Sequence, residues 1–279
     1  MIHTSRQLKA LVRNMSKGDS TKAQTIIRNY VMERFLERLS VSSYRDNLII
    51  KGGVLVASMV GLDNRSTMDV DTTIKNLPLS EESARKIVGD IAAIQIDDGM
   101  LFEIRNVASI MDDTDYPGIR VLLDATLETM QTPLKIDFST GDVITPCELS
   151  YSYKLLFEDR SISLLAYNLE TVLAEKLETL LARGTVNSRM RDFYDLYALE
   201  RSQSHNIDRV VLKNAFSNTT KKRGSSAIMI ESDKTLSEVE SSPDMMALWA
   251  IYQRKFEYAN DISWDDVMQT VRKMCRDIT

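Results

Sequence analysis

One stretch, KGGVLVASMVGLDNRSTMDVD at residues 51–71, constrains this chain more than any other. Its glycine pair, Gly52 and Gly53, closely follows a short apolar run at residues 48–50, with Lys51 between them. Because glycine has no Cβ, a strand that ends in Gly-Gly lets the backbone approach another group closely. We expect a helix over residues 54–60, whose unpaired N–H groups would point toward that place and suit an anion such as phosphate.

Two aspartates, Asp69 and Asp71, close the same stretch. Residues two apart in a strand share a face, so their carboxylates would lie side by side. Adjacent carboxylates repel unless a cation lies between them, and hard oxygen ligands suit Mg²⁺, with Mn²⁺ as an alternative. Phosphate-binding amides with a carboxylate pair a short loop away are the parts of metal-assisted phosphoryl or nucleotidyl transfer. The alternative interpretation is a tight turn followed by a solvated, acidic strand end.

The order of these motifs, Gly-Gly and then Asp-x-Asp, resembles the nucleotidyltransferases of the DNA polymerase beta superfamily. The fuller string GG-x-L…R-S-T-M-D-V-D is similar to one branch of it, the AbiEii/AbiGii toxin family. This resemblance implies that Gly52, Gly53, Arg65 and Thr67 contribute to nucleotide binding. For Thr67 two interpretations stay open. Its hydroxyl lies on the face of the carboxylates if the strand begins that early, or it caps the loop through a local backbone hydrogen bond.

A third carboxylate is expected in the segment PLKIDFST at residues 133–140. Alternation along a strand places apolar side chains on one face and polar ones, including Asp137, on the other. The resemblance implies a third carboxylate on a strand beside the Asp-x-Asp strand, and Asp137 matches it. Asp137 would then complete the metal site or take a proton from the attacking hydroxyl. An ordinary aspartate that faces solvent is the alternative.

The order of elements predicts an α+β fold. Residues 1–45 have helical spacing, and residues 100–165 alternate as strands do, with a turn expected at Asp115-Tyr116-Pro117-Gly118. Everything from Asn168 onward is expected to be helical. The resemblance implies a minimal nucleotidyltransferase mixed sheet with flanking helices, followed by a helical C-terminal lobe. We expect two domains, residues 1–160 and 161–279, with the second contributing to the active-site cleft.

A charged residue interrupts the leucine stripe of the first C-terminal helix. Asn168 suits its N-cap and Gly184 suits its end. Lys176 falls inside the stripe, and because a lysine among leucines is costly to bury, it should reach an anion or water. Asp192 and Asp195 follow at a spacing that places both on one face of the next helix.

The same residues carry a second part of the resemblance. The toxin family has a lysine in an E-K-L helix and then R-x-x-D-F-Y-D-L, and Lys176, Arg189, Asp192 and Asp195 match. This implies that Lys176 neutralises the triphosphate and that Asp192 orients the lysine or an arginine by a charge-assisted hydrogen bond. The alternatives are a lysine that only reaches solvent and an aspartate that favours the positive end of its own helix.

Composition excludes several other classes of site. Two histidines and two distant cysteines disfavour a zinc site or a histidine-based triad, and the cysteine usage favours the cytoplasm. No apolar run approaches the roughly 20 residues that span a bilayer, so no membrane association is expected. The net charge of −5 gives no general affinity for nucleic acid, so RNA would need a local basic patch. The basic loop expected at residues 221–223 is a candidate, although such a loop is more often a solvated turn.

The resemblance implies a concrete activity, the transfer of a nucleoside monophosphate from an NTP to an RNA acceptor, with the 3′ end of tRNA as the expected acceptor. It also implies a bacterial toxin of a toxin–antitoxin or abortive phage-defence pair, with a cognate antitoxin protein. Two other classes stay open. The same site would serve protein nucleotidylation or a kinase, and a catalytically silent binding partner would keep the fold alone. The intact Asp69 and Asp71 pair argues against a silent protein.

Overall fold

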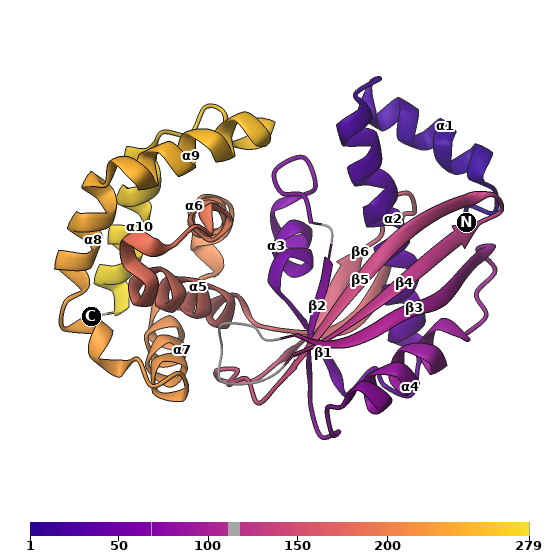
Figure 1. Ribbon diagram of the computed structural model, residues 1–279, viewed down its shortest axis with the longest axis horizontal. Coiled ribbons are helices and arrows are strands. Elements are labelled where there is room, and N and C mark those ends of the chain that lie inside the picture. The colour runs from indigo at the N-terminus through magenta and orange to yellow at the C-terminus, as the bar shows by residue number, and fades with distance from the viewer. Residues whose placement is uncertain (68, 111–117, 279) are drawn as a thin grey trace. The chain divides into compact units, whose positions relative to one another are not determined.

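We describe the fold from a computed structural model, in which residues 1–67, 69–110 and 118–278 are described (Figure 1). Its contacts divide the chain into two compact units. The first comprises Met1–Ser58, Ser66–Asp142 and Leu149–Ala166, and the second comprises Met59–Arg65, Val143–Glu148 and Tyr167–Thr279. The predicted domains, 1–160 and 161–279, stay a prediction.

The first unit is organised around a mixed sheet (Figure 1). Within the described residues, its strand order is β3-β4-β5-β2-β1-β7-β6. Strand β2 pairs antiparallel with β1 and parallel with β5, while β1 pairs parallel with β7. The expected turn at Asp115-Tyr116-Pro117-Gly118 lies mostly at residues 111–117, outside the described residues. The strand bounds are β1 Leu48–Lys51, β2 Asp69–Ile74, β3 Met100–Ile110, β4 Gly118–Leu127, β5 Met130–Thr140, β6 Leu149–Lys154 and β7 Ser161–Ala166.

Alternation along the strands gives the sheet one apolar and one polar face. Val121 on β4 is the register partner of Ile136 on β5, and both are fully buried with Val70 of β2. This apolar face packs against α2 (Ser20–Val41) and α4 (Glu81–Ala92), with α1 (Ser5–Ser16) against α2. The opposite face carries the aspartates of interest. The predicted α+β class is confirmed, because strands and helices segregate as layers rather than alternate.

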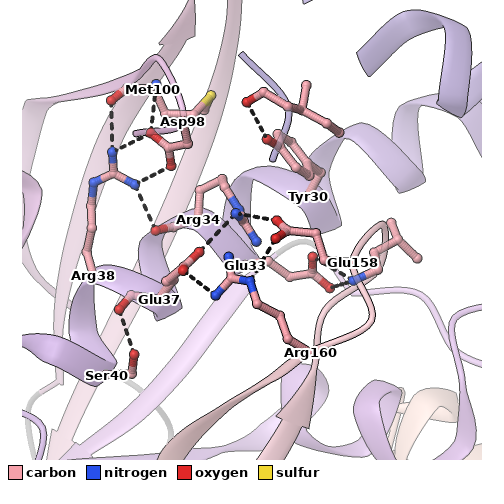
Figure 2. Close-up of polar contacts among 12 residues, drawn as sticks. Tyr30, Glu33, Arg34, Glu37, Arg38, Ser40, Asp98, Met100, Glu158 and Arg160 are labelled. Carbon is pink, nitrogen blue, oxygen red and sulfur yellow. Dashed lines mark hydrogen bonds and ion pairs between the residues drawn. The ribbon is translucent and has the colours of Figure 1, made fainter. Parts of the chain in front are cut away.

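Helix α2 carries charged side chains into the interior of the first unit (Figure 2). Arg34 Nη1 lies 2.9 Å from Glu37 Oε2 and 3.0 Å from Glu158 Oε1. Arg160 contacts the same two carboxylates, at 2.6 Å for Glu37 and 2.7 Å for Glu158. Buried charges are costly unless they are paired, so this alternating ring is what allows Arg34 to be 1% exposed.

A second buried pair fixes α2 to the start of β3. Arg38 donates to both carboxylate oxygens of Asp98 at 2.7 and 2.8 Å, and also to the backbone carbonyl of Met100 (Figure 2). Its guanidinium lies 5.0 Å from the ring centre of Phe102. A planar guanidinium suits this bidentate and stacked arrangement better than a lysine would.

Glu33 differs from these residues because its carboxylate faces a backbone donor. Both oxygens accept from Leu156 N at 3.0 Å (Figure 2). Burial raises the pKa of Glu33 to about 8, although the Leu156 N–H and Arg34 pull it down. The folded chain therefore holds a proton on Glu33 at a pH at which the unfolded chain has released it.

We expect Glu33→Gln to stabilise the fold at about pH 8 and to change little at about pH 5. The pKa of Glu33 is raised on folding from 4.5, so the stability of the parent falls as pH rises from 4.5 toward 8. Glutamine does not titrate, so the variant keeps the few kcal/mol of stability that the parent loses over this pH range, and its Oε1 still accepts from Leu156 N. Thermal melts followed by circular dichroism measure the difference, with the exposed Glu82→Gln as control. The same shift at both pH values would contradict the assignment.

The second unit is helical in the part of the chain that is described. Asn168 caps its first helix by accepting from Thr171 N at 3.0 Å, and Gly184 ends that helix, as the sequence predicts. The predicted basic loop is instead the last turn of α7 followed by Arg223, which pairs with Glu178. No described helix is long and apolar enough to cross a membrane. The helices are α5 Leu169–Arg183, α6 Met190–Gln203, α7 Arg209–Lys222, α8 Ser232–Ser241, α9 Pro243–Lys255 and α10 Trp264–Ile278.

Candidate functional site

The glycine pair forms the junction between β1 and α3 (Gly52–Val60), so the helix begins two residues earlier than the sequence predicts. Gly52 has φ +62°, a conformation that glycine adopts without strain. A Cβ at this position would lie 2.2 Å from Asp71 Oδ2. The backbone N–H of Gly53 donates to the same oxygen at 3.3 Å. In this structure the backbone of the two glycines therefore lies close to the Asp71 carboxylate.

The three predicted carboxylates lie on the polar face of the sheet. Asp71 on β2 is the register partner of Asp137 on β5, and Asp69 lies two residues before Asp71 on the same face. Partial burial raises the pKa of Asp71 above its ordinary value, and repulsion from Asp137 and Asp69 adds to the rise. This crowding of negative charge is what a bound cation would relieve.

Three cationic side chains accompany the carboxylates. Lys135 Nζ lies 2.7 Å from Asp69 Oδ2, and Arg120 donates to both oxygens of Asp137 at 2.8 Å. Lys51 Nζ lies 2.6 Å from Asp142 Oδ2. Lys51 is also the register partner of Asp71, and its charge lowers the pKa of Asp71 against the burial that raises it.

Hard carboxylate oxygens on neighbouring strands fit a divalent cation. The residues that would hold it are Asp69 and Asp71, with Asp137 on the adjoining strand. The fit is incomplete as the side chains stand, because no three acidic, histidine or cysteine side chains of the described residues converge as a metal site. Asp69 and Asp137 point to basic partners instead, so cation binding requires these two side chains to exchange partners.

We expect Gly52→Ala to lower nucleotidyl transfer at least tenfold and to destabilise the first unit. The new methyl group would overlap the Asp71 side chain, and a non-glycine residue at φ +62° adds about 1 kcal/mol of strain. Transfer assays and thermal melts measure both effects.

Gly18→Ala is the matched control for this prediction. Gly18 also has positive φ, +89°, but nothing lies within 4 Å of a Cβ placed there. The Gly18→Ala substitution therefore measures the effect of backbone strain without steric overlap. Equal effects of the two substitutions would show that the contact with Asp71 is unimportant.

The predicted lysine and aspartates of the second unit form one buried cluster. Asp195 is 0% exposed and accepts from Arg65 Nε at 2.6 Å and Nη2 at 3.2 Å. Lys176 Nζ lies 2.7 Å from Asp195 Oδ2 and 2.6 Å from Asp192 Oδ1. Burial lowers the pKa of Lys176, but the two carboxylates outweigh it and hold the pKa above its ordinary value. Lys176 is therefore charged and held in place by Asp192 and Asp195.

Two of the predicted nucleotide-binding residues are engaged within the protein. Arg65 is 2% exposed and its guanidinium is paired with Asp195. Thr67 is 3% exposed, and its hydroxyl donates to the backbone carbonyl of Asp69 at 3.4 Å, the local bond that was one of its two interpretations. Nucleotide contacts by Arg65 and Thr67 stay predictions.

Four charged residues at the polar face have no role predicted from the sequence: Lys51, Arg120, Lys135 and Asp142. The sequence did contain a signal for Lys135. It lies two residues before Asp137 in the same strand, so the two side chains share one face. For Asp142, the structure shows that its Oδ2 also accepts from the Thr73 and Ser139 hydroxyls at 2.7 and 2.8 Å. Nothing local marks Arg120, because its partner depends on strand register.

Solved structures share this fold, and two from Helicobacter pylori are similar to the chain. One, described as a candidate nucleotidyltransferase, has a TM-score of 0.52 and 14% identity over 91% of this chain and 96% of that one. The other, JHP933, has a TM-score of 0.54 and 14% identity over 91% of this chain and 93% of that one. At this identity the similarity shows the fold.

The class of protein comes from the family comparison, which identifies the chain as a nucleotidyltransferase. The family model described as nucleotidyl transferase AbiEii toxin, type IV toxin–antitoxin system, matches residues 34–270. The chain belongs to this family, which confirms the resemblance seen in the sequence. Family membership implies an NTP substrate and an antitoxin partner, and such enzymes generally use a divalent metal. No curated protein sequence matches the chain.

Proposed function

We propose that this protein transfers a nucleoside monophosphate from an NTP to an RNA acceptor, with the 3′ end of tRNA as the acceptor, and uses Mg²⁺ or Mn²⁺. In this proposal it acts in the bacterial cytoplasm as the toxin of an abortive phage-defence pair. One observation carries the enzymatic part. Asp69, Asp71 and Asp137 share one face of the β2–β5 pair, beside the Gly52-Gly53 junction.

Each part of the reaction has a candidate residue. The 3′-hydroxyl oxygen of the acceptor forms a bond to the α-phosphorus, the bond to the β-phosphate oxygen breaks, and pyrophosphate leaves. Asp137 serves either as a metal ligand or as the base that takes the hydroxyl proton. A divalent cation, when bound, neutralises charge on the phosphates and favours the ionised hydroxyl.

The resemblance extends this proposal to the second unit. It assigns Lys176 as a counter-ion of the triphosphate and Asp192 as the residue that orients the lysine. The 2.6 Å contact between their side chains supports the second role. Glycines Gly52 and Gly53 would contribute backbone N–H groups to phosphate binding once the Gly53 amide is released from Asp71.

Labelled nucleotides test this function directly. The protein is incubated with tRNA, with Mg²⁺ or Mn²⁺, and with each NTP in turn, labelled either at the α-phosphate or at the γ-phosphate. Nucleotidyl transfer predicts α-label on the tRNA and γ-label in pyrophosphate. A 3′-to-5′ exonuclease then shows whether the label is at the 3′ end, because it releases a terminal labelled 5′-monophosphate before any other nucleotide.

The other outcomes separate the alternatives. The γ-label on the acceptor would indicate a kinase, and α-label on a protein would indicate protein nucleotidylation. Absence of transfer to tRNA, other RNA and protein with every NTP would favour a silent binding partner and contradict the proposal.

A further inference from the structure

Basic and acidic side chains form rows across the polar face of the sheet, with two adjacent carboxylates between basic groups. Strand register places Arg120 of β4, Asp137 of β5, Asp71 of β2 and Lys51 of β1 in one row. In the adjoining row Lys135 of β5 is the register partner of Asp69 of β2. Asp69 and Asp137, two of the three candidate metal ligands, are therefore each paired with a basic side chain of the same sheet.

These two ion pairs differ from the buried pair of the second unit. The side chains of Lys135 and Asp69 are 28% and 31% exposed, whereas those of Arg65 and Asp195 are 2% and 0% exposed. Solvent-exposed ion pairs contribute little to stability, because water and salt screen them. The Lys135 pair can therefore open at low cost. The Arg120 pair is held more firmly, because its contact with Asp137 is bidentate and the Asp137 side chain is only 18% exposed, so its opening needs a stronger competitor such as a phosphate group.

Charge balance decides when these pairs open. Asp69, Asp71 and Asp137 carry a formal charge of −3, and Lys135 and Arg120 together carry +2. A divalent cation that enters alone must displace two basic groups and then lie within a few ångströms of them, which is repulsive. A nucleotide triphosphate reverses this balance, because its phosphates attract the same basic groups.

We propose that Lys135 and Arg120 are resident counter-ions that couple metal binding to nucleotide binding. In the resting protein they pair with Asp69 and Asp137. When the nucleotide arrives, their cationic groups move to phosphate oxygens and leave the carboxylates to the divalent cation. This proposal rests on the carboxylate site of the proposed function and adds a role for two residues outside it.

Mn²⁺ binding to the intact protein tests the coupling without measuring catalysis. Free Mn²⁺ is titrated by electron paramagnetic resonance, with and without an NTP analogue whose α,β-bridge cannot be cleaved. We expect the analogue to tighten Mn²⁺ binding by the parent well beyond what the analogue alone binds. Lys135→Met should tighten binding of Mn²⁺ alone by roughly tenfold, because one nearby positive charge is gone. The same variant should bind the analogue more weakly.

Matched variants isolate the effect of position. Lys154→Met makes the same charge change at an exposed site on β6, the edge strand, and should leave both Mn²⁺ titrations as in the parent. Arg120→Met should shift Mn²⁺ binding in the same direction as Lys135→Met. Asp71→Asn should weaken Mn²⁺ binding whether or not the analogue is present.

The outcomes distinguish the counter-ion role from the metal site itself. If Asp71→Asn weakens Mn²⁺ binding but Lys135→Met and Arg120→Met bind as the parent does, the site stands and the counter-ion role is wrong. Tight Mn²⁺ binding by the parent that the analogue does not improve would also overturn the coupling. If no variant binds Mn²⁺ under either condition, the carboxylate assignment fails and this proposal fails with it.

Discussion

Asp71→Asn should lower nucleotidyl transfer by about 1,000-fold or more while the protein keeps its fold. Asparagine has nearly the same shape, and its Oδ1 can still accept from the Gly53 N–H. It lacks the charge that would hold a divalent cation, and a metal ion contributes several kcal/mol to such a transition state, at about 1.4 kcal/mol for each tenfold in rate. Transfer of label from α-labelled NTP to RNA measures the loss.

The same substitution should leave thermal stability unchanged or slightly raised at neutral pH. Partial burial and the neighbouring Asp137 already raise the pKa of Asp71, so its negative charge opposes folding in the protein alone. The matched control is Asp124→Asn on β4, on the same polar face of the sheet as Asp71. Asp124 lies 3.5 Å from Arg105, and this variant should transfer nucleotides as the parent does. An Asp71→Asn protein that melts far below the parent, or one that keeps more than a tenth of its transfer, would refute the metal assignment.

Asp195→Asn should destabilise the second unit by about 3–5 kcal/mol. Asp195 is fully buried and accepts from both Arg65 and Lys176, so its removal leaves two cations close together without their shared carboxylate. Both tryptophans, Trp249 and Trp264, belong to the second unit, so their fluorescence in urea reports on the unfolding of that unit.

Lys176→Met is the informative comparison for this second prediction. It removes one cation but leaves the bidentate contact between Arg65 and Asp195, so the loss of stability should be much smaller than for Asp195→Asn. If Lys176 neutralises the triphosphate as proposed, Lys176→Met also raises the KM for NTP and lowers the rate. Equal destabilisation by the two variants would show that Lys176, rather than the shared carboxylate, holds the cluster together.

Much of the site could be predicted because its signals are local. A glycine pair after an apolar run, and aspartates two residues apart, are consequences of backbone geometry that neighbouring residues alone determine. Asn168 and Gly184 mark the ends of their helix for the same reason. The resemblance to the AbiEii toxins rested on these same local strings and is confirmed over residues 34–270.

The loop residue Arg65 shows where local reasoning ends. The resemblance implied a nucleotide contact for Arg65, which stays a prediction. The structure adds a partner that the sequence did not indicate, an aspartate 130 residues away that pairs with the guanidinium. Helix α2 shows the same limit. Arg38 pairs with Asp98 and Arg34 pairs with Glu158, both far along the chain, although Arg34 also pairs with the nearby Glu37. Nothing within a few residues of an arginine tells whether such a partner exists.

The sequence by itself determined the class of fold, the family and the identity of the paired aspartates, since each depends on residues within one turn or one strand. Tertiary structure alone decided which cation faces which carboxylate. The pairs of Asp69 with Lys135 and of Asp137 with Arg120 follow from the register of three strands, and the cluster around Asp195 follows from a loop and two helices. Charges act through space over a few ångströms, and only the folded chain determines which charges come that close.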